Sequence, residues 1–251
     1  MNLRLSGIVA AISTIVFAVT AQAAITFNQN VTNNAIFGGG NANGAFTVDR
    51  ANNVELGLRA KVRFPMPANV FNSNGNGTYN HAAGVGTPTS RAMWNFEWSI
   101  NSDQSGTSAR KLSALTFVLG IDYDPSAAAV FNTFSPTAAF SDNSFGDNTT
   151  AQGAGVEAAS AGAYATLMST SNLVQNSWNL DFFNEVFALS FDPTADGNYS
   201  FFLAAFDVQG LLLARTEVTV IVGAGADVPE PGSLVLAGLA LAALALRRRK
   251  P

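Results

Sequence analysis

The chain has 251 residues, a formal net charge of −4 and no cysteine. The lack of cysteine excludes disulfides, thiol chemistry and any metal site that uses cysteine ligands. When Arg4, Glu230 and the four cations at 247–250 are left out, 8 basic and 16 acidic residues remain between Ala24 and Asp227. This part of the chain therefore has a net charge of −8, which argues against binding of nucleic acid or anionic lipid.

The first 23 residues have the pattern of a secretory signal peptide. Arg4 supplies the positive start, residues 7–19 form an apolar run, and Ala21-Gln22-Ala23 is a small-x-small cleavage site. We expect cleavage between Ala23 and Ala24, which would send the following residues out of the cytoplasm. An uncleaved anchor helix is the alternative interpretation.

Alternation of apolar and polar residues predicts β-strands in the exported part. From Val54 to Phe64 every second residue is apolar, which is typical of a long, half-buried strand with one charged face. Trp94, Phe96 and Trp98 alternate with polar residues in the same way. Four further strands are expected, at residues 112–123, 186–191, 199–208 and 211–222.

These elements predict an all-β fold for residues 24–222, namely an antiparallel β-sandwich, of which a jelly roll is one arrangement. Gln209-Gly210 is expected to form a tight turn between the last two strands. One alanine-rich segment, 156–174, is expected to be helical. The Asn-, Gly- and Ser-rich segments 71–89 and 126–155 are expected to be long loops at the ends of the sandwich.

Candidate catalytic groups are few. His81 is the single histidine, and no Gly-x-Ser-x-Gly motif presents a nucleophilic serine, which disfavours both a catalytic triad and a histidine metal cluster. We expect His81 to be solvated or to brace a loop. A pair of distant carboxylates for glycoside hydrolysis leaves no local signature, so an exported hydrolase is kept as the third hypothesis behind two non-enzymatic ones.

Asp192 and Asp196 are the candidate metal ligands. Residues 192–197 match the first half of a calcium loop, in which oxygens at positions 1, 3 and 5 converge and a glycine makes the bend. The second half does not match, because Leu203 stands where the loop needs a glutamate. An Asp-Gly turn that enters a strand is the favoured interpretation, so no cofactor is expected and calcium is the alternative.

Two tryptophans pose a similar choice. Trp94 and Trp98 share one face of an expected strand, and exposed aromatic side chains on a sheet would suit a sugar-binding protein. The polar residues between them mark that face as the buried one, so packing in the core is the favoured interpretation.

A separate tail follows a short linker at 223–227. Residues 228–251 contain Val228-Pro229-Glu230-Pro231, an apolar run at 232–246, and the cations Arg247, Arg248, Arg249 and Lys250. Proline disfavours helix and central strand, so the triplet is expected to be extended and accessible. The run is expected to be a short transmembrane helix of roughly 22 Å, less than the ~30 Å hydrocarbon core, with its cations on the cytoplasmic side. Such a marginal span suits a temporary anchor.

This tail resembles the PEP-CTERM sorting signal of exported bacterial proteins. In that family an exosortase, an integral membrane protease, recognises and cuts the tail. The resemblance implies that Pro229, Glu230 and Pro231 form the recognition peptide and that the protein is held in the inner membrane during transit. It also implies delivery to the cell surface or extracellular matrix, in connection with a biofilm or exopolysaccharide. A plain anchor with a chance Pro-Glu-Pro is the alternative.

The favoured function is therefore that of an exported, non-enzymatic surface or matrix protein, sorted through its tail by an exosortase. The competing hypothesis is a carbohydrate-binding module that is displayed by the same tail. Its partner would be an extracellular polysaccharide, and binding would occur with or without the help of calcium.

Overall fold

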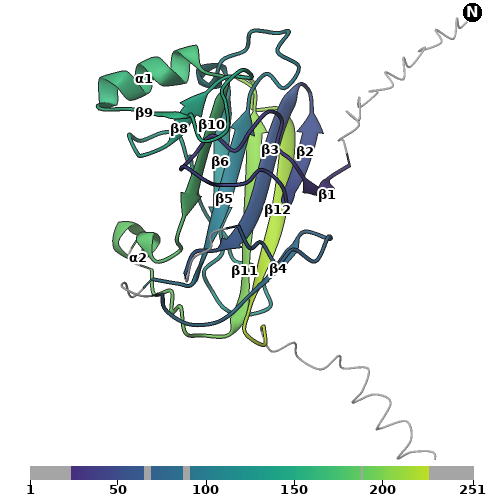
Figure 1. Ribbon diagram of the computed structural model, residues 1–251, viewed down its shortest axis with the longest axis vertical. Helices are drawn as coiled ribbons and strands as arrows, with labels where there is room; N and C mark the ends of the chain where they lie inside the picture. The colour runs from purple at the N-terminus through teal and green to yellow at the C-terminus, as the bar shows by residue number, and fades with distance from the viewer. Residues whose placement is uncertain (1–23, 65–68, 87–90, 188, 226–251) are drawn as a thin grey trace, which may run out of the picture.

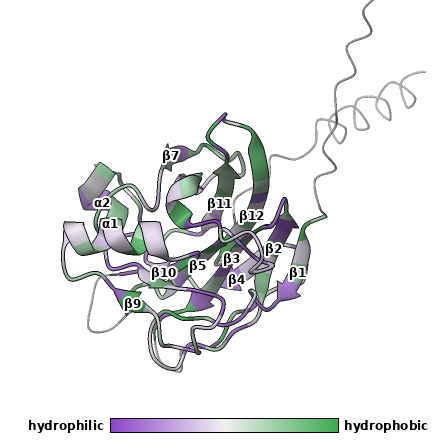
Figure 2. Ribbon diagram, turned by 90° about the horizontal axis from the view of Figure 1, so that it is seen from above, coloured by the Kyte–Doolittle hydropathy of each residue, from purple (hydrophilic) through white to green (hydrophobic). Residues whose placement is uncertain are grey.

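The computed structural model describes residues 24–64, 69–86, 91–187 and 189–225. They form two β-sheets packed face to face, with two α-helices on one side and β1 on the other (Figures 1 and 2). This arrangement confirms the all-β prediction. The signal peptide expected at 1–23 and the transmembrane helix expected at 232–246 lie outside the described residues.

The larger sheet, sheet A, has only antiparallel pairs, and its strand order is β1-β2-β3-β5-β10-β8-β9. Its strands are β1 Thr26–Gln29, β2 Phe46–Ala51, β3 Val54–Val62, β5 Trp94–Asn101, β10 Leu173–Trp178, β8 Ser144–Gly146 and β9 Val156–Glu157. The chain therefore returns to this sheet several times, and its central strands come from distant parts of the sequence.

The smaller sheet, sheet B, has the order β4-β12-β11-β6-β7. Its strands are β4 Thr78–His81, β12 Leu212–Val222, β11 Gly197–Phe206, β6 Thr116–Ile121 and β7 Asn132–Phe134. β4 pairs with β12 in parallel, so this sheet is mixed. The expected hairpin between β11 and β12 is confirmed: Gly210 has a φ of 80°, which glycine tolerates, and its N–H donates to Asp207 O at 3.0 Å.

Aromatic side chains fill the space between the two sheets. Trp94 and Trp98 of β5 are 1% and 0% exposed, which confirms their interpretation as core residues. The ring of Phe96 stacks on that of Phe201 of β11, with centroids 4.4 Å apart, and Trp94 meets Tyr199 at 5.9 Å. Such pairs add to the stability that burial of the rings already provides.

Two expected elements have a different structure. The strand predicted at 186–191 is wrong, because residues 182–187 form helix α2, Phe182–Phe187. Phe183 and Phe187, four residues apart, stack with centroids 5.8 Å apart, and both contact Phe134 of β7. Their apolar character therefore reflects a helical face rather than a strand.

The expected helix at 156–174 is confirmed only in its centre, as α1 Ala161–Thr170. Ser160 caps it by accepting a hydrogen bond from Ala163 N, and the residues on either side join β9 and β10. The segment at 112–123 begins as a short 3-10 helix, Leu112–Ala114, before β6. The expected loops at 71–89 and 126–155 contain the short strands β4, β7 and β8.

The prediction of a half-buried β3 is also wrong, because its charged face is covered. A stretch of chain at 30–45, here called the covering segment, crosses the outer face of sheet A (purple in Figure 1). Eight of the nine residues of β3 are buried as a result. Gly57 leaves room for this crossing, since a Cβ there would lie 2.7 Å from Val31 Cγ1.

Polar side chains of sheet A hold the covering segment by its backbone. Gln175 Oε1 accepts a hydrogen bond from Ile36 N at 2.7 Å, and Gln175 Nε2 donates to Asn34 O at 2.9 Å. Glu55 Oε1 accepts from Thr32 N at 2.6 Å. These bonds satisfy backbone groups that are buried or part-buried against the sheet, which explains why the face is polar although it is covered.

A buried charge cluster lies at the centre of the same face. Glu97 pairs with Arg59 at 2.5 Å and with Lys61 at 2.9 Å, and none of the three side chains is more than 3% exposed. Arg59 Nη1 also donates to Ala42 O at 2.9 Å and to Gly44 O at 2.6 Å. Burial lowers the pKa of Arg59, and the charge of Glu97 opposes that change. One carboxylate therefore pairs with two cations, and loss of it would leave both without an anionic partner.

We predict that Glu97→Gln lowers the free energy of unfolding by about 3–5 kcal/mol, because it leaves two buried cations without their anion. The matched control is Glu217→Gln, which removes a carboxylate from the half-exposed pair with Arg215. That change should cost about 1 kcal/mol or less. Urea denaturation of the three proteins measures both values, and equal losses for the two variants would contradict the role assigned to the cluster.

Candidate functional site

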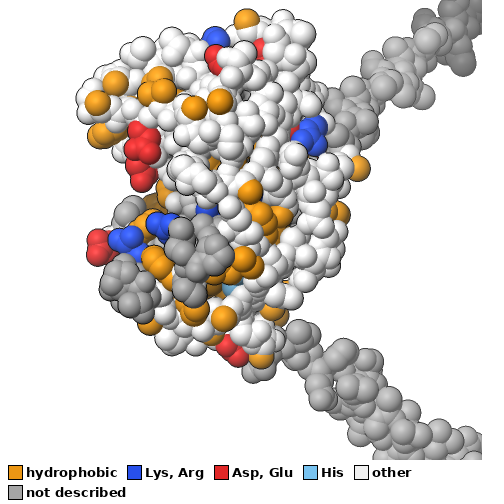
Figure 3. All heavy atoms as spheres, viewed as in Figure 1, with side chains coloured by type: hydrophobic (Ala, Val, Ile, Leu, Met, Phe, Trp, Pro, Cys, Tyr) orange, Lys and Arg blue, Asp and Glu red, His pale blue; other side chains and the backbone are white. Residues whose placement is uncertain are grey.

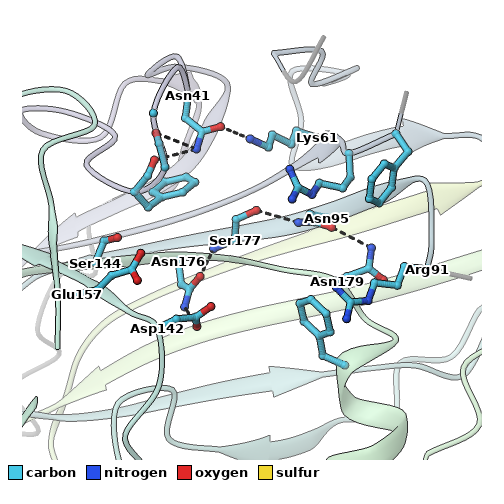
Figure 4. A pocket seen from close by; sticks show the side chains of 16 residues that line it. Asn41, Lys61, Arg91, Asn95, Asp142, Ser144, Glu157, Asn176, Ser177 and Asn179 are labelled. Carbon is cyan, nitrogen blue, oxygen red and sulfur yellow. Dashed lines mark hydrogen bonds between the residues drawn. The ribbon is translucent and has the colours of Figure 1, made fainter. Parts of the chain in front are cut away.

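A cleft of about 390 Å³ lies on the outer face of sheet A, beside the covering segment (Figure 4). Its lining comes from the covering segment, the end of β3, the start of β5, strands β8 to β10 and helix α2. The volume is in the range of about 300–1,000 Å³ that is typical of sites for small organic ligands. The cleft is therefore the candidate binding site.

Side-chain amides and a hydroxyl form a connected row along the cleft (Figure 4). Asn179 Nδ2 donates to Asn95 Oδ1 at 2.9 Å, and Asn95 Nδ2 donates to Ser177 Oγ at 3.0 Å. Asn179 is fixed in turn by bonds to the carbonyl oxygens of Ala92 and Trp94. Because Ser177 Oγ accepts in this row, its own proton can be donated to a ligand.

Three cations line one part of the cleft. Lys61 is held in place by Glu97 and by the side chain of Asn41. Arg63 and Arg91 are exposed, and within the described residues no carboxylate lies within 4.0 Å of Arg63. The Arg91 guanidinium lies 4.2 Å from the centroid of the Phe182 ring, a cation–π contact that orients it.

Two carboxylates lie at the opposite end, away from the labelled Lys61 and Arg91 (Figure 4). Asp142 and Glu157 are both exposed, and Asp142 Oδ1 accepts a hydrogen bond from Asn176 Nδ2 at 3.0 Å. Figure 3 shows a group of Lys and Arg side chains on the left of this face, with one acidic group above them and another beside them. The cleft therefore offers hydrogen-bond donors at one end and acceptors at the other.

His81 lies outside this cleft, at the end of β4, and is 6% exposed. Its ring stacks on Trp94 with centroids 6.1 Å apart, and neither ring nitrogen has a hydrogen-bond partner in the described part of the chain. Burial lowers the pKa of His81 to about 4. The expectation of a solvated histidine was therefore wrong, and the ring is a neutral core group.

The candidate metal ligands each stabilise a turn. Asp192 Oδ1 accepts hydrogen bonds from Thr194 N at 2.8 Å and Thr194 Oγ1 at 2.7 Å, and these bonds lower the pKa of Asp192. Asp196 Oδ2 accepts from Ala224 N at 3.0 Å. Among the described residues, no group of three or more His, Asp or Glu side chains could hold a metal ion. The calcium alternative stays a prediction.

Sequence reasoning did not find the cleft. Its polar lining comes from segments far apart in the chain, and each segment alone resembles an ordinary loop or strand end. Arg63 and Arg91 carried the one available signal, because they are two of only eight cations in an acidic exported part. The sequence does not show whether the two arginines lie near each other, so the cleft could be identified only from the three-dimensional structure.

Comparison with known proteins identifies the tail. Residues 227–250 match the PEP-CTERM protein-sorting motif, as the resemblance predicted. The chain thus carries the sorting tail of an exported protein that an exosortase processes. No curated protein and no solved structure has significant similarity to the chain. The motif and its residues Pro229, Glu230 and Pro231 lie outside the residues that the structure describes.

Within residues 24–64, 69–86, 91–187 and 189–225, no helix has the length and apolar character needed to cross a membrane.

We predict that His81 makes the protein less stable in acid. Its pKa is about 4 in the folded protein and about 6.5 when unfolded, so protons bind the unfolded state more tightly. The stability that depends on neutral His81 is complete above pH 6.5 and decreases as the pH falls to about 4, by up to about 3 kcal/mol.

The test compares free energies of unfolding of the native protein and His81→Leu from pH 7 to pH 4. Leucine keeps an apolar group against Trp94 and cannot be protonated, so the variant should lose less stability over this range. Parallel curves for the two proteins would contradict a buried, neutral His81.

Proposed function

We propose that this protein is exported, is sorted through its PEP-CTERM tail, and acts without enzymatic activity at the cell surface or in the extracellular matrix. The match of residues 227–250 to the sorting motif carries this proposal. The signal-peptide pattern at the other end of the chain supports export independently, because it depends on different residues.

Each part of the tail has a separate role in this proposal. Pro229, Glu230 and Pro231 are recognised by the exosortase, because prolines keep the backbone extended and accessible. The apolar run at 232–246 holds the protein in the inner membrane during transit, and the cations at 247–250 keep the tail end on the cytoplasmic side. A role in a biofilm or exopolysaccharide layer belongs to the same proposal and is supported by the family resemblance alone.

We predict that Glu230→Ala, or deletion of residues 247–250, leaves an unprocessed precursor in the membrane fraction. The first change removes the acid between the two prolines, and the second removes the charge that sets orientation. Cell fractionation in a host with an exosortase, followed by mass spectrometry of the released protein, measures the outcome. Glu217→Ala, an acid on sheet B, is the control and should be processed normally. Normal release of Glu230→Ala would contradict the proposal.

A second candidate function is binding of a saccharide by the exported domain. The cleft supports it, because amide and hydroxyl groups line it together with the rings of Phe37, Phe64 and Phe182. Such a mixture of polar groups and aromatic walls is common in sites for small polar ligands.

We predict that the full chain, purified in detergent, binds a defined set of glycans on an array. The array is run with and without calcium, and Asp192→Ala and Asp196→Ala are compared with the native chain. Calcium-dependent binding that both variants lose would support a metal at residues 192–197. Absence of binding in both conditions would contradict the saccharide function and leave the sorting proposal intact.

A further inference from the structure

We propose that Lys61 and Asn41 react to form an intramolecular isopeptide bond, which joins the covering segment covalently to β3. The side-chain amine of Lys61 replaces the amide nitrogen of Asn41, and Glu97 transfers the protons. This modification goes beyond the sorting and binding functions proposed above and depends on neither of them.

The two reacting side chains are in contact. Lys61 Nζ donates a hydrogen bond to Asn41 Oδ1, and Asn41 Cγ, the carbon to be attacked, is bonded directly to that oxygen (Figure 4). Asn41 Nδ2, the leaving nitrogen, donates to Phe37 O at 2.8 Å. The amide is therefore held at both ends, with its oxygen toward the amine. Such fixed proximity replaces an encounter between separate molecules and lowers the barrier to reaction.

Glu97 is the base within reach of the amine. Its Oε1 lies 2.9 Å from Lys61 Nζ, and neither side chain is more than 3% exposed. Although the pair is close, Oε1 accepts no hydrogen bond in the described part of the chain, whereas Oε2 accepts one from Arg59 Nε. Oε1 is therefore available to take the proton that the amine must lose before it can attack a carbonyl carbon.

Atoms and charges balance in this exchange. Lys61 Nζ bonds to Asn41 Cγ, and the bond between Cγ and Nδ2 breaks. The ammonium group of Lys61 gives up two protons in turn, and Glu97 passes both to Nδ2. The leaving nitrogen departs as an ammonium ion, the protonated form of ammonia, and Glu97 ends as the carboxylate that it was at the start. The reaction needs no oxidant and no other co-reactant.

The charges of the buried cluster favour the product. Before the reaction, one carboxylate faces two buried cations, Arg59 and Lys61, so the cluster holds one positive charge in excess. Burial of an unbalanced charge is costly. The isopeptide bond converts the Lys61 cation into a neutral amide and leaves Glu97 paired with Arg59 alone. It also supplies a covalent cross-link to an exported chain that has no cysteine for a disulfide.

Mass spectrometry of the denatured full chain, purified in detergent from a host without an exosortase, tests the bond. We expect an intact mass that is lower by one ammonia molecule than the sequence requires. Trypsin cuts after arginine and unmodified lysine. The peptide that contains Asn41 and ends at Arg50 should therefore be joined to residues 60–63, which stay uncut at Lys61.

Variants identify the residues that react. Asn41→Ala should have the full mass and separate peptides. Asn43→Ala is the matched control, because it removes an asparagine of the same segment whose side chain binds backbone within that segment, and it should keep the bond. Glu97→Gln should leave the peptides separate, since an amide does not take the proton from the amine. The native chain and Asn41→Ala decide on the bond even if Glu97→Gln does not fold.

An intact mass equal to that of the sequence, with Lys61 cut by trypsin, would overturn the proposal. Loss of ammonia confined to one peptide would also overturn it, because an Asn-Gly pair such as Asn43-Gly44 releases ammonia by ring closure on its own backbone. Peptides that remain joined in Asn41→Ala would exclude Asn41 as the partner of Lys61. Complete joining in Glu97→Gln would overturn the role given to Glu97.

Discussion

The buried ion cluster of Arg59, Glu97 and Lys61 is the interaction on which the arrangement of this protein depends. A β-sandwich normally exposes the outer face of each sheet, and charged residues there interact with water. Here the covering segment removes that water, so the charges must be satisfied by one another and by backbone carbonyls. Sheet A is consequently packed on both faces, with an aromatic core inside and a polar, hydrogen-bonded layer outside.

The same arrangement positions the candidate site. Asn41 of the covering segment bonds to Lys61, and both residues line the cleft, so the cleft lies where the covering segment borders the polar face of sheet A. The side chains of sheet A that bind the backbone of the covering segment are of the same types as several that line the cleft, namely amides, carboxylates and cations. The face that binds the covering segment therefore presents similar polar groups in the neighbouring cleft.

The sequence predicted the main strands but not the covered face. The period of two from Val54 to Phe64 identified a strand and its inner side correctly, because alternation reports which residues point the same way. It could not show whether the charged side meets water or another segment. His81 was misjudged for the same reason, since local sequence carries no information on packing against Trp94. The sorting tail could be identified from the sequence because its motif consists of consecutive residues and does not depend on the fold.

Amide hydrogen exchange is the most direct test of this account. The N–H groups of Thr32 and Ile36 lie in a segment without regular secondary structure, yet they donate to Glu55 and Gln175 on the buried face. If the segment packs on sheet A as described, these two amides should exchange slowly, on the scale of core strand amides. Exchange as fast as that of an unprotected loop would show that the outer face is open, and would contradict the account.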